Sequence, residues 1–109
     1  MSMKYKVIVD PQAKQDLKEI FFYVDVNDNI QSANKLLDAL EETCSKLEKI
    51  PERGYIPTEL RPTGIKRYLE IHYKPYRIIY EIEKNIIYIH CVIDGKRNIQ
   101  EILSNRLLR

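Results

Sequence analysis

The apolar residues in the first half of the chain recur at helical spacing. One apolar stripe lies within residues 13–24 and a second within residues 33–47, with most positions three or four residues apart. Asp10–Pro11 marks the start of the first helix, because aspartate caps an opening turn and proline is tolerated in that turn. The polar run 25–29 ends this helix, and Pro51 disfavours continuation of the second. The pattern therefore predicts a helical hairpin.

The second half of the chain has the composition of β-strands. Three runs rich in β-branched and aromatic residues follow one another at residues 66–73, 76–83 and 86–93. Only two residues separate each run from the next, and such short connections join antiparallel neighbours. A further short strand is predicted at residues 5–9, directly before the first helix. Between the hairpin and the strands, residues 51–65 contain three prolines and two glycines, which predicts a loop.

A short helix is predicted at the end of the chain. Asn98, with Glu101 three positions later, resembles a capping box, and Leu103 would dock the helix. The complete order is strand, two helices, three strands and a short helix, which separates the helices from an antiparallel sheet. The predicted fold class is therefore α+β, in a single domain over residues 1–109.

Alternation along the predicted strands sorts their side chains onto two faces. The middle strand places four large apolar side chains on one face, which should receive the helical hairpin. These four are Tyr76, Ile78, Tyr80 and Ile82. Arg77 lies on the opposite face, together with Tyr68, Glu70 and His72 of the preceding strand. We therefore expect a solvent-exposed polar face opposite the hairpin.

This polar face carries a candidate site for RNA cleavage. Cleaving a phosphodiester through its own 2′-hydroxyl needs a base, cations that stabilise the charged phosphorane, and an acid for the leaving oxygen. His72 could act as base or acid, because histidine side chains change charge near neutral pH. Arg77 and Arg97 offer planar donor forks for phosphate oxygens, and Glu70 could orient His72 or replace it as the base. The candidate catalytic residues are therefore His72, Arg77, Glu70 and Arg97.

Three further residues are predicted to bind the substrate. Lys74 lies between the first two strands of the run, and Lys96 lies in the turn after the last strand. Both would supply point charges for phosphate oxygens. Tyr68 lies on the same face as the candidate catalytic residues and could stack on an unpaired base.

Structural interpretations of the same residues remain open. His72 could be an ordinary surface residue of an exposed strand. Glu70 and Arg77, on neighbouring strands, could form a cross-strand ion pair worth a fraction of a kcal/mol. His90 lies in the most apolar strand and is expected to be a hydrogen-bonded core or interface histidine rather than a ligand.

Charge is unevenly distributed along the chain. There are 18 lysines and arginines against 16 acidic residues, for a net charge of +2. Residues 1–60 hold 8 bases and 11 acids, a balance of −3, whereas residues 61–109 hold 10 bases and 5 acids, a balance of +5. The second half could therefore face an anionic partner such as a phosphate backbone or an acidic peptide. Equally, the two halves could neutralise each other within the fold.

Composition excludes several classes of protein. Hydrophobic residues at 44% and charged residues at 31% are typical of a globular chain rather than a disordered one. The longest apolar stretch, 86–93, is far shorter than the roughly 20 residues that span a bilayer. The amino terminus lacks a secretory pattern, so we expect a cytoplasmic protein without a membrane partner. Cys44 and Cys91 fit neither a disulfide framework nor a zinc motif, so we expect reduced, buried thiols and no metal or other cofactor.

Four stretches of the chain resemble one known protein family. They are AKQDLKEIFFYV, LEKIPERGYIPTEL, YLEIHYKPYRIIYEI and IIYIHCVIDGKRNIQEILSNRLLR. Their most specific elements are the Tyr-Arg-x-x-Tyr core at residues 76–80 and the Asp-Gly-Lys-Arg turn at residues 94–97. In this order and spacing they resemble the RelE/ParE superfamily of bacterial toxins from type II toxin–antitoxin modules. The resemblance implies a curved antiparallel sheet of about four strands with an N-terminal helical hairpin on one face and a short C-terminal helix.

The RelE-like branch implied by this resemblance consists of ribosome-dependent messenger-RNA endonucleases. Arg77 and Arg97 fall on the matching arginine positions of that branch. Where RelE-like members have strand lysines, this chain has Tyr68 and Glu70, and Leu103 replaces the tyrosine of their final helix. His72, Glu70 and Lys74 could supply a different acid–base set. On this hypothesis, truncation of exposed Arg77 or His72 should abolish toxicity without unfolding the protein.

The ParE-like branch instead inhibits DNA gyrase without a nuclease site. The long hairpin of this chain is similar to that branch, whereas a short final helix with Arg106 and Arg109 is similar to the nuclease branch. We expect a toxin that arrests growth and is neutralised by an acidic cognate antitoxin. The favoured hypothesis is a metal-independent endoribonuclease acting on messenger RNA. Gyrase inhibition and a degenerate scaffold that only binds its antitoxin are the alternatives.

Overall fold

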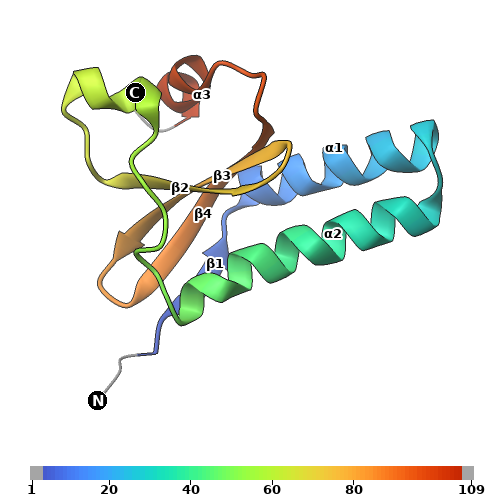
Figure 1. The fold of residues 1–109 in the computed structure, drawn as a ribbon, viewed down its shortest axis with the longest axis horizontal. Coiled ribbons are helices and arrows are strands. Elements are labelled where there is room, and N and C mark those ends of the chain that lie inside the picture. Colours follow the sequence, from blue (N-terminus) through green and yellow to red (C-terminus); the bar gives the residue numbers. More distant parts are fainter. Residues whose placement is uncertain (1–3, 107–109) are drawn as a thin grey trace.

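The structure, a computed structural model, describes residues 4–106, so Arg109 lies outside the described residues. The helices are α1 (Pro11–Asn27), α2 (Ile30–Ser45) and α3 (Ile99–Arg106), and the strands are β1 (Lys6–Val9), β2 (Tyr68–Tyr73), β3 (Tyr76–Glu83) and β4 (Ile86–Asp94) (Figure 1). Two 3₁₀ helices, η1 (Lys46–Glu48) and η2 (Thr58–Thr63), lie between α2 and β2. Every helix and strand expected from the sequence is present, and η2 adds a helical turn to the expected loop.

The four strands form one sheet in the order β1-β4-β3-β2. As predicted, β2, β3 and β4 pair antiparallel through two-residue connections. β1 instead lies parallel to β4, with Lys6 opposite Ile86 and Val9 opposite Ile89. The hairpin and two strands separate β1 from β4 along the chain, and a connection of that length permits a parallel pair. The predicted α+β fold is confirmed.

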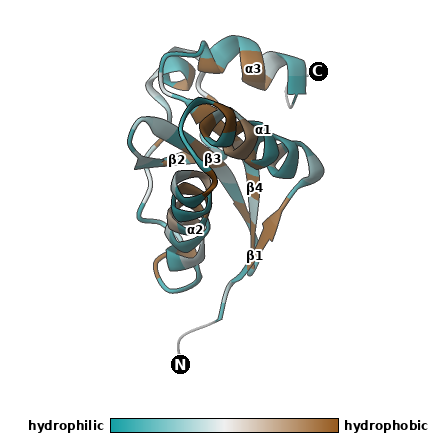
Figure 2. Cartoon of the chain, turned by 90° about the vertical axis from the view of Figure 1, so that its right-hand side faces the viewer, coloured by the Kyte–Doolittle hydropathy of each residue, from teal (hydrophilic) through white to brown (hydrophobic). Residues whose placement is uncertain are grey.

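The predicted hairpin of α1 and α2 packs on one face of the sheet (Figures 1 and 2). Asp10 caps α1, as expected, by accepting a 2.9 Å hydrogen bond from the Ala13 N–H. Asn29 caps α2 in the same way, at 2.7 Å from the Ser32 N–H. Apolar side chains of the hairpin and the sheet form a buried cluster between them, which we call the hairpin-side cluster. Its fully buried members include Tyr80.

Tyr80 also fixes the connection that follows the hairpin. Its hydroxyl donates to the Pro51 carbonyl at 2.7 Å and accepts from the Gly54 N–H at 3.0 Å. A Cβ atom at Gly54 would lie 2.6 Å from the Tyr80 hydroxyl and 2.7 Å from the Glu70 carbonyl oxygen. Only glycine therefore allows the chain to approach the sheet this closely. This close approach holds the start of the 51–65 segment against β2, where Tyr55 forms a backbone bridge to Glu70.

The opposite face of the sheet is covered rather than open. Side chains of β2, β3 and β4 pack there against Leu60 of η2 and against Ile99 and Leu103 of α3, forming a second cluster. Figure 1 shows α3 beside the 3₁₀ segment. Tyr68 and Glu70 are only 2% and 1% exposed. The expectation of an exposed polar face is therefore wrong at Tyr68 and Glu70, because η2 and α3 cover this part of the sheet. The side chain of His72, nearer the end of β2, stays 38% exposed.

A β-bulge makes β4 change faces part-way along. Ile79 of β3 lies opposite Cys91, but the next residue, Tyr80, lies opposite Ile89. His90 is therefore the extra residue of the bulge. As a result, Ile89 belongs to the hairpin-side cluster while Cys91 belongs to the second cluster.

Candidate functional site

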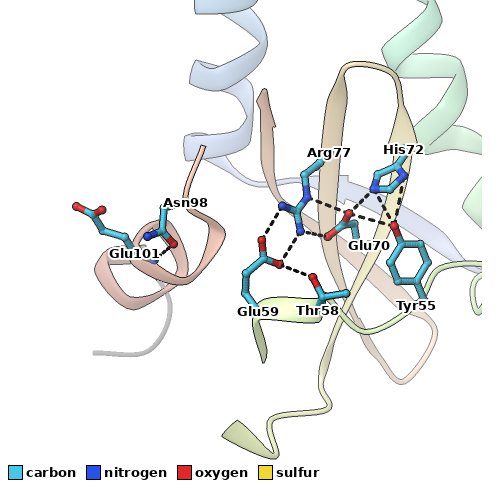
Figure 3. A network of polar contacts seen from close by, with 8 residues as sticks. All are labelled: Tyr55, Thr58, Glu59, Glu70, His72, Arg77, Asn98 and Glu101. Atoms are coloured by element: carbon cyan, nitrogen blue, oxygen red, sulfur yellow. Dashed lines mark hydrogen bonds and ion pairs between the residues drawn. The ribbon is translucent and has the colours of Figure 1, made fainter. Parts of the chain in front are cut away.

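Arg77 of β3 is at the centre of the polar cluster in Figure 3. Its Nε and Nη2 atoms donate to Glu70 Oε2 and Oε1 at 2.9 and 2.6 Å. Its Nη1 and Nη2 atoms each donate to a carboxylate oxygen of Glu59 at 2.8 Å. Since Glu59 belongs to η2, these bonds tie the 51–65 segment to the sheet. Four of the five guanidinium N–H groups are thus used within the fold.

Glu70 of β2 connects Arg77 to His72 and Tyr55 (Figure 3). Glu70 Oε2 is in contact with His72 Nε2, and the Tyr55 hydroxyl lies 2.9 Å from that nitrogen and 3.4 Å from Glu70 Oε2. The Tyr55 and His72 rings meet edge to face, with centroids 5.5 Å apart. Glu70 is therefore placed to orient His72, as expected, and the catalytic roles of both residues stay predictions.

Burial and paired charges shift the pKa values of three residues in this cluster, Glu59, Arg77 and Tyr55. The hydrogen bonds from Arg77 hold the pKa of Glu59 at about 2, well below its usual value of 4.5. The hydrogen bonds to Glu59 and Glu70 raise the pKa of Arg77 above its already high value. Partial burial and, after it, the negative charge of Glu70 raise the pKa of Tyr55. At neutral pH, Arg77 is therefore charged, Glu59 is ionised and the Tyr55 hydroxyl keeps its proton.

A pocket of about 310 Å³ opens beside the cluster. It is lined by Tyr55, Thr58, Glu70, His72, Lys74, Pro75, Tyr76, Arg77 and Gly95. Lys74 is exposed at this pocket. The structure thus gathers Glu70, His72, Lys74 and Arg77 around one cavity, four of the seven residues that the sequence predicted for the site.

The remaining three predicted residues lie elsewhere. Arg97 lines a separate hollow of about 400 Å³ with Asp16 and Glu19 of α1. Lys96 is exposed in the turn after β4 and does not line the pocket beside Arg77. Tyr68 is buried in the second cluster, so its predicted role in base stacking is wrong. Arg97 thus lines a different hollow from Arg77.

Sequence reasoning missed Tyr55 and Glu59, the two residues that complete the cluster. Both come from the 51–65 segment, which was expected to be a loop because it has little hydrophobic periodicity. Tyr55 is placed by a backbone bridge to Glu70, with N···O distances of 3.1 and 2.7 Å. No local pattern reveals a bridge between residues this far apart in the chain.

Other predicted features are confirmed. His90 is a partly buried, hydrogen-bonded histidine, with Nδ1 2.8 Å from Asp10 and Nε2 2.9 Å from Glu81. Cys44 and Cys91 are free and buried, and burial raises the pKa of each thiol to about 12. Both thiols are therefore poor nucleophiles in the folded protein.

Arg106 anchors α3 to α1. Its two terminal nitrogens donate to the two carboxylate oxygens of Asp16, each at 2.8 Å. Asp16 is 6% exposed and also accepts a 3.0 Å hydrogen bond from the Val92 N–H. Arg106 is therefore used to hold the final helix in place.

Residues 4–106 contain neither a group of side chains suited to a metal ion nor a membrane-spanning helix. No three histidine, cysteine, aspartate or glutamate residues are grouped so that they could hold a metal ion. None of the helices in this range is both long enough and apolar enough to cross a membrane.

The sequence of this chain matches a known protein family. Residues 7–99 match the model of the ParE toxin of type II toxin-antitoxin system, parDE. The chain belongs to the ParE toxin family. Toxin ParE3 of Caulobacter vibrioides is 25% identical over 101 residues, which cover 93% of this chain and 97% of that relative. The protein is thus a toxin component of a type II toxin–antitoxin module.

Solved structures share the fold of this ParE-family chain. The chromosomal ParDE system of P. aeruginosa has a TM-score of 0.71 at 17% identity, over 85% of this chain and 98% of that one. A mutant of the E. coli toxin RelE in the free state has a TM-score of 0.66 at 14% identity, over 98% of each chain. The RelBE2 toxin–antitoxin complex of Mycobacterium tuberculosis has a TM-score of 0.61 at 20% identity, over 84% and 99%. The RelE/ParE-like fold expected from the resemblance is therefore confirmed.

Acid is expected to weaken the ParE-family fold through Glu59. Because the pKa of Glu59 is lowered in the folded state, its stabilising contribution is complete above pH 4.5 and is lost as the pH falls toward about 2. Thermal unfolding should therefore show a steeper fall in Tm over this range for the wild type than for Glu59→Gln. Identical pH profiles for the two proteins would contradict this prediction.

Proposed function

We propose that this ParE-family toxin arrests growth by binding DNA gyrase and does not cleave nucleic acid. One observation carries the proposal: the Arg77 guanidinium, which a nuclease would direct at phosphate, already donates four N–H groups to Glu59 and Glu70. A cation stabilises a phosphorane only if its donors are free to face the developing charge. Phosphate would have to displace two carboxylates from Arg77.

The residues at which the chain departs from the RelE-like pattern support the same proposal. Tyr68, Glu70 and Leu103 stand where the resemblance puts two lysines and a tyrosine, and all three are buried. Arg97, the second matching arginine, lines the hollow beside α1. None of these four residues supplies a free donor to the pocket beside Arg77.

A cognate antitoxin is the proposed neutralising partner. Solved relatives of the same fold include a ParDE toxin–antitoxin system and a RelBE2 toxin–antitoxin complex. The balance of +5 over residues 61–109 favours a partner with an acidic segment, because opposite charges steer association.

A supercoiling assay with purified gyrase tests the proposed target. The wild-type toxin is expected to inhibit supercoiling by gyrase, and induction in cells is expected to stop DNA synthesis before protein synthesis. Addition of the cognate antitoxin should restore both. Full gyrase activity at saturating toxin, with early arrest of translation, would overturn the proposal.

A messenger-RNA nuclease is the second candidate function, because His72, Glu70 and Tyr55 contact one another beside a pocket that Lys74 also lines.

The variant His72→Ala distinguishes gyrase binding from nuclease activity. The His72 side chain is 38% exposed, so its truncation leaves little cavity. Gyrase binding predicts that the variant stays toxic, whereas catalysis by His72 predicts a loss of cleavage of about 100- to 1,000-fold. Growth assays after induction, with circular dichroism to verify folding, give the answer.

A further inference from the structure

A third hollow lies at the outer edge of β2, beside Tyr55 and His72 of the polar cluster. Its volume is about 330 Å³, within the range of about 300–1,000 Å³ that is usual for ligand sites. It is lined by Thr43, Lys46, Arg53, Tyr55, Glu70, Ile71, His72 and Tyr73. Lys46 is the first residue of η1, Arg53 lies in the connection from η1 to η2, and Tyr73 ends β2, so three parts of the chain meet there.

Two cations of this hollow are free to bind an anion. Within residues 4–106, the side chains of Lys46 and Arg53 form no ion pair, and both residues are exposed. The only acidic lining residue is Glu70, whose oxygens are already held by Arg77 and His72. The hollow therefore presents two cations without ion-pair partners, whereas Arg77 in the neighbouring pocket is paired with two carboxylates.

Two aromatic rings stand in the same hollow. Tyr55 is 43% exposed and Tyr73 is 40% exposed. Half-exposed rings beside free cations are the combination that binds single-stranded nucleic acid, since bases stack on the rings and phosphates face the cations.

The backbone at this edge argues against an extended peptide as the ligand. A peptide adds to a sheet edge through a row of open N–H and C=O groups. Here Tyr55 already uses both outward backbone groups of Glu70. Alternation along β2 leaves only those of His72 open in the hollow. The backbone groups of a single residue are too few to bind an added peptide strand. The aromatic rings and the cations are therefore the groups of this hollow that can recognise a ligand.

We propose that the hollow formed by Lys46, Arg53, Tyr55 and Tyr73 binds the phosphodiester backbone and a base of single-stranded nucleic acid. This site shares Tyr55 with the polar cluster around Arg77, but it adds Lys46, Arg53 and Tyr73, which do not line the pocket beside Arg77. It does not depend on how the toxin acts on its target. The shared chemistry of single-stranded DNA and RNA is the recognition element, because both supply phosphates and stacking bases.

Fluorescence anisotropy with labelled oligo-dT and oligo-rU of about a dozen nucleotides tests the site. The wild-type toxin should bind with an affinity that falls as salt rises from about 50 to 200 mM. Lys46→Ala/Arg53→Ala should reduce the slope of log K against log salt by about 1.4, since each cation that meets a phosphate of a single strand contributes about 0.7. Tyr73→Leu should weaken binding roughly 5- to 150-fold with little change in that slope.

A matched control distinguishes binding at this hollow from non-specific attraction of the oligonucleotide to the positive charges of the protein. Lys14→Ala/Lys18→Ala removes the same two charges from the hairpin, where both lysines line a different hollow, and should leave affinity and slope nearly unchanged. An equal loss in both double variants would overturn the proposal, as would undetectable binding by the wild type. Displacement of the oligonucleotide by polyglutamate of equal charge, as effectively as by unlabelled oligo-dT, would also overturn it and assign the hollow to acidic peptides. Tighter binding of oligo-rU or of oligo-dT identifies the preferred strand and supports the site.

Discussion

Arg77→Ala is expected to lower the stability of the whole domain. The variant leaves the Glu70 carboxylate, whose side chain is 2% exposed, buried beside His72 without its cation. Removing one partner of a buried ion pair costs about 3–5 kcal/mol. In a domain of this size that corresponds to a fall in Tm of at least about 10 °C, which thermal unfolding followed by circular dichroism measures. The structure therefore predicts the opposite of the sequence analysis, which expects this truncation to leave the fold intact.

Two comparison variants identify the cause. Glu59→Ala removes a partner that is 28% exposed and leaves Arg77 paired with Glu70, so a smaller loss of about 1 kcal/mol is expected. Arg77→Met/Glu70→Met removes both charges together and should be more stable than Arg77→Ala alone. If Arg77→Ala unfolded at the wild-type temperature, the buried ion pair would not stabilise the protein. If Arg77→Ala is not toxic, its stability must first be compared with that of these variants. Only then can a direct role of Arg77 in toxicity be distinguished from loss of the folded protein.

Tyr80→Ala is expected to be at least as damaging. The Tyr80 side chain is fully buried in the hairpin-side cluster, and its removal leaves a cavity that costs about 3–5 kcal/mol. The lost hydroxyl also leaves the Pro51 carbonyl and the Gly54 N–H without their partner, which adds about 1–3 kcal/mol. Denaturant unfolding should therefore show a much lower midpoint, or no folded protein.

Tyr80→Phe separates the two contributions. It keeps the ring in the cluster and removes only the hydroxyl, so the expected loss is the smaller amount of about 1–3 kcal/mol. The midpoints should rank wild type, then Tyr80→Phe, then Tyr80→Ala. A Tyr80→Phe midpoint equal to that of the wild type would mean that the hydroxyl does not hold residues 51–65 in place.

The sequence predicted those parts of the fold that depend on local periodicity. The apolar stripes gave the hairpin, and two-residue connections gave the antiparallel order of β2, β3 and β4. It did not predict the parallel pairing of β1, because a long connection leaves orientation free. Nor did it predict the bulge at His90, since one extra residue in a strand leaves no mark on a pattern of mostly apolar residues.

The site was predicted to the extent that neighbouring strands bring alternate residues together. Glu70, His72 and Arg77 were correctly grouped because the register of β2 and β3 follows from their short connection. Tyr55 and Glu59 were missed because tertiary contacts alone place the 51–65 segment over the sheet. Leu60 of the same segment packs in one cluster with Tyr68, which is buried. The alternation of side chains along β2 had predicted that Tyr68 would be exposed to solvent.

The two apolar clusters lie on opposite faces of one sheet, and from this arrangement we expect η2 and α3 to open locally before the rest of the molecule unfolds. The second cluster is closed by Leu60, Ile99 and Leu103 from η2 and α3, whereas the larger hairpin-side cluster contains none of them. Elements held by fewer buried contacts open at lower free energy than the global unfolding. Amide hydrogens of η2 and α3 can therefore exchange with solvent while those of α1, α2 and the central strands stay protected. In such an opening, Glu70 and Arg77 become hydrated without any loss of the hairpin.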